Sequence, residues 1–173
     1  MITIFVHDFN NISQDFYDYV IENTQIHRLT CSCGHSACLN IHGYYVRTIK
    51  LHEGSIRLKI LRVKCSHCGR THAILLSSIV PYSQIPLSDQ HKIILDFESG
   101  TPVYSTCDEN SSIDENNVKY IIRQYTKHWR EMIRSLRIQL SDLISVVKHC
   151  FSNYSVQFMQ NHRCINSLFS KTT

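Results

Sequence analysis

The stretch VKCSHCGRTHAIL, residues 63–75, carries two cysteines three positions apart and a glycine directly after the second. Another cysteine-rich stretch, CSCGHSAC, covers residues 31–38 and contains three more cysteines. Between them, residues 44–64 form two runs, YYVRTIKL and SIRLKILRV, separated by HEG. Because the connection is short and contains a glycine, and both runs are rich in β-forming residues, they predict a β-hairpin. The two cysteine groups therefore bracket this hairpin on both sides.

The predicted hairpin needs a stabilising element outside itself. In its second run, three aliphatic residues alternate with Arg57 and Lys59, so one face is expected to be apolar and the other basic. A two-stranded hairpin alone is only marginally stable in water. Cysteine knuckles at both ends of a hairpin form the plan of a zinc ribbon, in which four thiolates bind one zinc ion. Structural zinc contributes on the order of 10 kcal/mol to the folding of small modules.

The cysteine spacing indicates which side chains would bind Zn²⁺. Cys65 and Cys68 have the C-x-x-C-G spacing that lets both sulfurs point to one ion. In the first group a glycine follows Cys33 just as one follows Cys68, which favours Cys33; its partner is Cys31, with Cys38 as the alternative. Four nearby histidines could each replace a thiolate: His35, His42, His67 and His72. Because four thiolates already close the coordination shell, each histidine is instead expected to hydrogen-bond to a ligand or to lie on the surface.

Two other interpretations of the cysteines are weaker. A redox dithiol is expected near a βαβ pattern at a helix N-terminus, whereas Cys65 and Cys68 lie between two strand-like runs. Cysteines placed by chance would not be expected on both sides of a hairpin. The N-terminus has no features of a secretion signal, so eight cysteines favour reduced thiols in the cytoplasm over disulfides. No stretch approaches the roughly 18 apolar residues of a membrane span.

Several segments of the chain resemble known bacterial proteins. HGYYVR, residues 42–47, and RVKCSHCGRTH, residues 62–72, look like the zinc ribbon that opens many insertion-sequence transposases. Residues 62–90, 116–131 and 157–162 are similar to a short uncharacterised bacterial family with a ribbon of that type. The resemblance implies a DNA-binding role linked to mobile elements. The CSCG knuckle departs from the C-x-x-C-G form common in transposase ribbons.

The sequence predicts an α+β fold, in which a small antiparallel zinc-ribbon sheet is followed by an all-helical domain. The first predicted domain, residues 1–86, contains an N-terminal segment and the ribbon, with knuckles at 31–38 and 65–68. The second, residues 87–173, is a helical DNA-binding domain. The boundary falls within 77–90, where two prolines and four serines interrupt regular structure. The stretch THAIL is expected to continue the ribbon as a third strand.

The strongest helical periodicity covers residues 112–140, where Ser112 and Glu115 fit a capping box. Cations step by three or four residues along this helix, which at about 100° per residue places them on one stripe that only Glu131 could partly neutralise. Shorter helices are expected over 13–23, 88–99, 101–110 and 140–151, the first two with Ser13 and Ser88 as caps. A helix-turn-helix with residues 113–128 in the major groove is one interpretation; a helical bundle with a solvated face is the other.

The charge distribution favours a polyanionic partner. The net charge is only +4, but residues 44–72 carry seven basic and one acidic side chain, and residues 118–137 carry six and one. Two separate basic blocks create a local field that a nucleic acid senses. The predicted DNA contacts lie on the hairpin and on the long helix: Arg47, Arg57, Lys59, Arg62, Lys119, Arg123, Lys127, Arg130, Arg134 and Arg137.

These features predict a zinc-dependent DNA-binding protein, acting as an accessory or regulatory factor of transposition, with double-stranded DNA and a transposase as partners. The alternative is a zinc-ribbon interaction module that binds RNA or an acidic protein surface without reading DNA sequence. An enzyme is not expected, because the sequence has no nucleophile–base pattern, phosphate loop or H-E-x-x-H motif.

Overall fold

The computed structural model describes residues 1–51, 54–102 and 112–160, and it has an α+β fold. The chain forms two compact units. The first comprises Met1–Ile49 and Ile56–Ser78, and the second comprises Lys50–Ser55 together with the described residues from Ile79 onward. The tip of the hairpin therefore belongs to the second unit. No helix in the described part of the chain is long and apolar enough to cross a bilayer.

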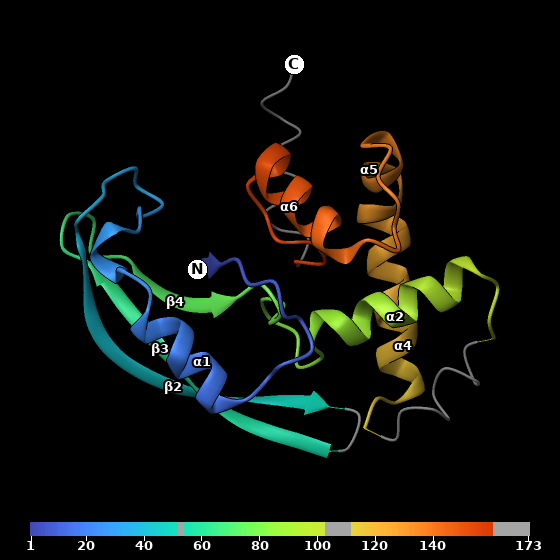
Figure 1. Cartoon of the computed structure of the whole chain (residues 1–173), viewed down its shortest axis with the longest axis horizontal. Coiled ribbons are helices and arrows are strands. Elements are labelled where there is room, and N and C mark those ends of the chain that lie inside the picture. The colour runs from blue at the N-terminus through green and yellow to red at the C-terminus, as the bar shows by residue number, and fades with distance from the viewer. Residues whose placement is uncertain (52–53, 103–111, 161–173) are drawn as a thin grey trace. The chain divides into compact units, whose positions relative to one another are not determined.

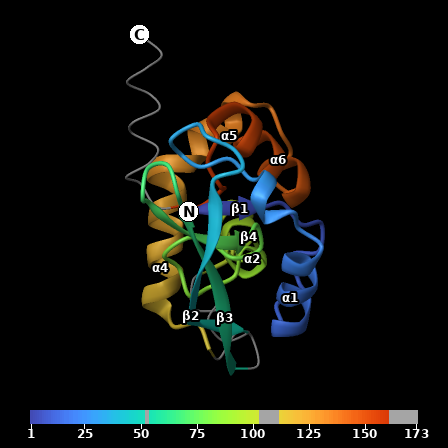
Figure 2. The ribbon, with the colours of Figure 1, turned by 90° about the vertical axis from the view of Figure 1, so that its left-hand side faces the viewer.

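The sheet of the first unit has the strand order β1-β4-β3-β2 (Figure 1). Its strands are β1 (Ile2–Ile4), β2 (Leu39–Leu51), β3 (Gly54–Cys65) and β4 (Thr71–Leu76). Strands β3 and β4 are antiparallel, with Arg62 opposite Ala73 and Lys64 opposite Thr71. The hairpin strands and the third strand over THAIL are thus confirmed. Strand β1 runs parallel to β4 and lies beside it (Figure 2), an addition that a purely antiparallel ribbon sheet did not include.

Strand β3 is buried on different faces along its length. Leu58 and Ile60 are buried while Lys59 is exposed, as the alternation predicted. From Leu61 the buried positions move to odd numbers, and Leu61 and Val63 belong to a core cluster that also contains Ile74 of β4. Because successive side chains of a strand point to opposite faces, the exposed cations of β3 change face at the same point.

Helix α1 (Gln14–Glu22) is tied to strands β3 and β4. Its N-cap is Ser13, as predicted, and the Ser13 hydroxyl accepts a hydrogen bond from the Phe16 N–H. The buried hydroxyl of Tyr17 donates to the Ile74 carbonyl at 2.9 Å and accepts the Leu61 N–H at 2.9 Å. These two backbone groups stand opposite one another in the β3–β4 register, just past the last paired residues. Tyr17 therefore replaces the next pair of ladder hydrogen bonds.

The described helices of the second unit are α2 (Leu87–Glu98), α4 (Glu115–Gln124), α5 (Arg130–Ser135) and α6 (Leu143–Tyr154). Helix α2 packs against α4 (Figure 1). Trp129 is fully buried and meets Phe158 edge to face, with ring centroids 5.3 Å apart. The Nε2–H of His91 on α2 donates to the Leu140 carbonyl at 2.6 Å, which ties α2 to the segment before α6.

The long predicted helix differs from the observed one in three ways. Its N-cap is Asp114, whose carboxylate accepts the Asn117 N–H at 2.8 Å, and not Ser112. A π-helical turn, Tyr125–Trp129, separates α4 from α5. The helix ends at Ser135, and Arg137 has a positive φ of 54°.

Of two further predicted helices, one begins slightly earlier than expected and the other lies almost entirely outside the described residues. Helix α2 begins one residue before the predicted cap Ser88, with Pro86 at the N-cap position. The helix predicted over 101–110 falls almost entirely outside the described residues, so the structure does not confirm a helix-turn-helix.

Candidate metal centre

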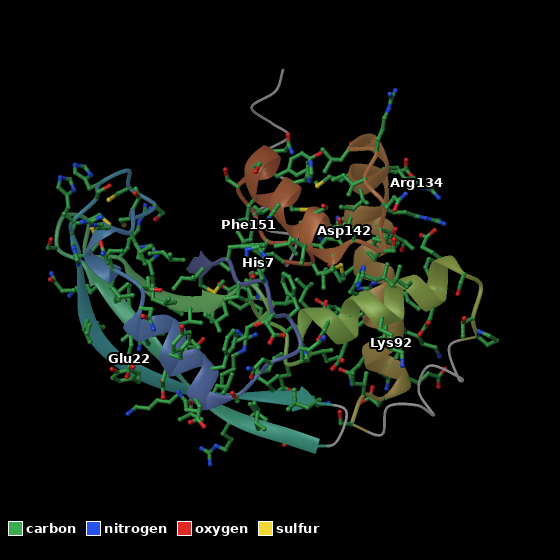
Figure 3. The ribbon with its side chains drawn as sticks, in the orientation of Figure 1. His7, Glu22, Lys92, Arg134, Asp142 and Phe151 are labelled. Carbon is green, nitrogen blue, oxygen red and sulfur yellow. The ribbon has the colours of Figure 1, made fainter. Side chains whose placement is uncertain are left out.

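The four predicted thiols lie together at one end of the sheet. Cys31 and Cys33 occupy the loop before β2, Cys65 ends β3, and Cys68 lies in the turn that leads to β4. Their Sγ atoms lie within 4.8 Å of one another, so they could hold a metal ion. Cys31 and Cys65 are buried and the other two are half-buried. Figure 3 shows sulfur-bearing side chains gathered where the loop and the turn meet. We call these four residues the four-cysteine group.

The two knuckles have matching backbone hydrogen bonds despite their different lengths. The Cys31 N–H donates to the His35 carbonyl, and the Cys65 N–H donates to the Arg70 carbonyl, both at 2.9 Å. The acceptor thus lies four residues after the donor in the first loop and five in the second. A left-handed glycine closes each knuckle: Gly34 has φ +89° and Gly69 has φ +73°. The irregular CSCG stretch is therefore a knuckle shortened by one residue.

Backbone N–H groups point at the sulfurs of the group. The Cys68 N–H lies 3.4 Å from the Cys65 Sγ and is the largest cause that lowers the pKa of Cys65 to about 6. The Cys33 N–H similarly lowers the pKa of Cys31. The Arg70 N–H acts the same way on Cys68, but burial and hydrogen bonds with the neighbouring sulfurs outweigh it and raise the pKa of Cys68 to about 11. Neighbouring thiolates repel one another, so full deprotonation of the group needs a cation among them.

Cys38 lies beside the four-cysteine group but outside it. Its Sγ is 3.3 Å from the Cys65 Sγ and donates to the His35 carbonyl at 3.2 Å. Burial raises the pKa of Cys38 to about 11, which keeps this thiol protonated. The sequence left Cys31 and Cys38 as alternatives, and the structure places Cys31 among the four.

Three of the four nearby histidines contact this centre. The Nε2 of buried His72 lies 3.2 Å from the Cys31 Sγ, and burial lowers the pKa of His72. Exposed His35 and His67 stack with ring centroids 3.5 Å apart, and the His35 Nδ1 is 3.6 Å from the Cys33 Sγ. Cys33, His35 and His67 form a second set whose ligand atoms lie within 4.8 Å of one another, a grouping that the sequence analysis missed. Its only signal was a histidine close to the cysteines of each knuckle, His35 two residues after Cys33 and His67 between Cys65 and Cys68.

Residues 30–115 match a domain of unknown function, DUF6431. The matched region contains both knuckles, strands β2 to β4 and helix α2. Comparisons with curated proteins and with solved structures found no match. The DUF6431 match carries no assigned function, and it does not confirm a transposase-type zinc ribbon.

The predicted hairpin cations all lie within the DUF6431 region but do not share one face. Arg57 and Lys59 are exposed, and the Lys59 ammonium lies 4.5 Å from the centroid of the exposed Tyr44 ring. Arg62 is also exposed, on the opposite face of β3. Arg47 is half-buried, and its burial lowers its pKa.

The predicted helical cations lie beyond the DUF6431 region, and three of them are paired with carboxylates. The ion pairs are Lys119–Glu115 at 2.6 Å, Arg130–Glu98 at 2.8 Å and Arg134–Glu131 at 3.0 Å. The expectation that only Glu131 could neutralise this stripe is therefore wrong. The π-helical turn also adds about one residue to the helical register, so cations before and after it do not form one continuous stripe. Exposed Arg123, Lys127 and Arg137 have no ion pair within the described residues.

Proposed function

We propose that this chain is a zinc-stabilised DNA-binding protein. The four-cysteine group would hold the zinc ion, and the sheet that this ion stabilises would supply the main contacts to the phosphate backbone. One observation carries the proposal. Strands β2, β3 and β4 together contain no aspartate or glutamate, but they contain six cations: Arg47, Lys50, Arg57, Lys59, Arg62 and Lys64.

The size of the four-cysteine group supports zinc. Four thiolates at about 2.3 Å from a tetrahedral ion have sulfur–sulfur separations of about 3.8 Å. The Cys31–Cys68 separation is 3.6 Å and the Cys33–Cys65 separation is 3.8 Å. Four thiolates close the shell of the ion, which is the arrangement of structural rather than catalytic zinc. Backbone N–H donors to the sulfurs stabilise the thiolate form.

The chemistry of the hairpin surface supports a nucleic acid as the partner. A sheet that carries cations and no carboxylates on its strands attracts a polyanion. The exposed Tyr44 ring beside Lys59 adds a surface that can stack or make van der Waals contacts alongside a phosphate contact. Because exposed cations occur on both faces of β3, one duplex would contact Arg57 and Lys59, or Arg62 and Lys64, but not all four through one flat face.

The role in transposition rests on the resemblance of residues 42–47 and 62–72 to the zinc ribbon of insertion-sequence transposases. On that basis we assign the chain an accessory or regulatory part, with a transposase as its partner. A transposase gene next to the gene for this protein in several genomes is the expected observation. Consistent absence of mobile-element genes from its neighbourhood would contradict this part of the proposal and leave the DNA-binding part standing.

Fluorescence anisotropy with a labelled duplex tests DNA binding. Affinity should fall steeply between about 50 and 200 mM salt, with a slope of about 0.9 per phosphate contacted. The double variant Arg57→Ala/Lys59→Ala should weaken binding and reduce the slope by about 1.8, because it removes two contacts. The matched control is Lys119→Ala/Arg134→Ala, which removes the same charge from residues already paired with carboxylates.

Two results would contradict DNA binding through the hairpin. Equal losses in the two double variants would show that net charge, and not the hairpin, attracts DNA. Tighter binding of single-stranded RNA or of an acidic peptide in a competition assay would favour the alternative of a zinc-ribbon interaction module.

A further inference from the structure

A second group of metal-ligating atoms adjoins the four-cysteine group. The thiol of Cys33 and the imidazoles of His35 and His67 each place one ligand atom within 4.8 Å of the other two. The two histidines come from different knuckles, His35 from the loop before β2 and His67 from the turn after β3. We call these three residues the Cys–His group.

The dimensions of the Cys–His group suit one metal ion. With a zinc–sulfur bond of about 2.3 Å and a zinc–nitrogen bond of about 2.0 Å, a thiolate and an imidazole on a tetrahedral ion stand about 3.5 Å apart. The Cys33 Sγ and the His35 Nδ1 are 3.6 Å apart. The two imidazole rings are stacked 3.5 Å apart with an interplanar angle of 20°. Both histidines are exposed, so each ring can turn about its side-chain bonds to direct a nitrogen at the ion.

We propose that the Cys–His group binds a second zinc ion in an open site, with Cys33 as a thiolate that bridges this ion and the ion of the four-cysteine group. The inference rests on the proposed zinc centre. Three protein ligands leave the fourth position to water, as in open zinc sites. The second ion would therefore exchange faster than the first.

Charge balance favours two ions over one. Four thiolates around one Zn²⁺ have a net charge of −2, and a second Zn²⁺ bound by two neutral imidazoles and the shared thiolate brings the cluster to zero. Like charges within a few ångströms repel strongly, so neutralisation stabilises the deprotonated sulfurs. Cys33 is the thiol suited to bridging, because it is half-buried between the buried Cys65, 3.8 Å away, and the exposed His35.

Cobalt titration of the reduced, metal-free full chain tests the second site. The first equivalent of Co²⁺ should produce the thiolate-to-cobalt charge-transfer band of the four-cysteine group. A second equivalent should increase the visible bands further and reduce the paramagnetic resonance signal per cobalt, because a bridging thiolate couples the two ions. Wild type is expected to saturate at two ions per chain.

The double variant His35→Ala/His67→Ala should saturate at one ion per chain and keep the first-equivalent spectrum. His42→Ala is the matched control, since His42 is an exposed histidine of β2 outside both groups, and it should still bind two. Elemental analysis after dialysis against zinc should likewise give two zinc ions per chain for wild type and one for the double variant.

Three results would overturn the inference in distinguishable ways. Saturation of wild type at one ion with a full thiolate spectrum would remove the second site and leave the four-cysteine centre intact. A second equivalent that survives in the double variant would place the second ion elsewhere. A first equivalent without a charge-transfer band would overturn the zinc centre itself, and with it both proposals.

Discussion

Cys31 and Cys38 are both buried thiols, and only their surroundings distinguish them. Cys31 receives a hydrogen bond from the Cys33 N–H, which lowers its pKa and favours the thiolate, and its Sγ lies 3.2 Å from the His72 Nε2. Cys38 donates its proton to a carbonyl, and burial raises its pKa. The spacing in the sequence could not separate the two, because the decisive partners come from β4 and from the backbone of the folded knuckle.

Paired substitutions separate the two cysteines experimentally. Cys31→Ser should weaken binding of the proposed zinc ion by more than about 100-fold, since even partners outside the coordination shell commonly contribute about 10- to 100-fold. Cys38→Ser should keep zinc within a fewfold of wild type. Competition with a chromophoric zinc chelator measures both affinities. The reverse order of effects would make Cys38 the ligand.

Tyr17 is a residue whose role no sequence pattern predicted. Its hydroxyl bonds two backbone groups of β3 and β4 that would otherwise be buried without partners. Tyr17→Phe should therefore lower the free energy of opening of the β3–β4 ladder by about 1–3 kcal/mol. Native-state hydrogen exchange of the Leu61 and Val63 amides measures this. Tyr19→Phe on the same helix, where Tyr19 is 63% exposed, should change exchange by less than about 0.5 kcal/mol.

At the scale of elements, the strands were easier to predict from the sequence than the helices. Alternation along residues 44–64 is a local property, and it located β2 and β3. The parallel pairing of β1 with β4 joins residues about seventy positions apart, and nothing local in MITIFV specifies it. The face change in β3 was also hidden, because it depends on what covers each end of the strand.

The long helix shows why a regular sequence pattern can mislead. Steps of three and four residues describe α4 and α5 separately, but the π-helical turn between them changes the register. The turn buries both Tyr125 and Trp129, so large aromatic side chains reach the core at the cost of helical regularity. The same arrangement separates the basic residues that a uniform helix would have aligned.

The burial of His91 on α2 should make the second unit sensitive to acid. Burial lowers the pKa of His91 from its usual 6.5, so the folded chain resists a proton that the unfolded chain accepts below that pH. Stability should therefore fall as the pH drops through 6.5, by up to about 1.4 kcal/mol per pH unit for one proton. His91→Gln keeps a donor for the Leu140 carbonyl without titrating. Urea unfolding at about pH 7.5 and about pH 5.5, on either side of the usual histidine pKa, should show a smaller loss in this variant.

The control for this experiment lies in the remaining histidines, which are the same in both proteins. Identical pH dependence in wild type and His91→Gln would show that the buried imidazole does not govern acid sensitivity. Trp129 is the only tryptophan of the chain and lies in the core of the second unit, so its fluorescence follows that unit.

At the scale of the whole molecule, the two units differ in what stabilises them. The core cluster of the first unit contains three cysteines of the knuckles, so its apolar packing is continuous with the four-cysteine group: Cys31, Cys38, Leu39, Leu61, Val63, Cys65 and Ile74. The second unit buries aliphatic side chains on α2, α4 and α6 and the aromatic rings of Trp129 and Phe158, all far from the four-cysteine group in sequence.

Removal of the proposed zinc ion should therefore affect the units unequally. Under a strong chelator, amides of Leu61, Val63 and Ile74 are expected to exchange faster by a factor on the order of a hundred or more, since structural zinc contributes folding free energy directly. The emission maximum of Trp129 should stay unchanged, because its packing against Phe158 involves no thiolate. Addition of zinc to the chelated protein should restore protection in β3 and β4. A red shift of Trp129 on chelation would show instead that both units unfold together, and unchanged exchange in β3 would show that the thiol group holds no structural ion.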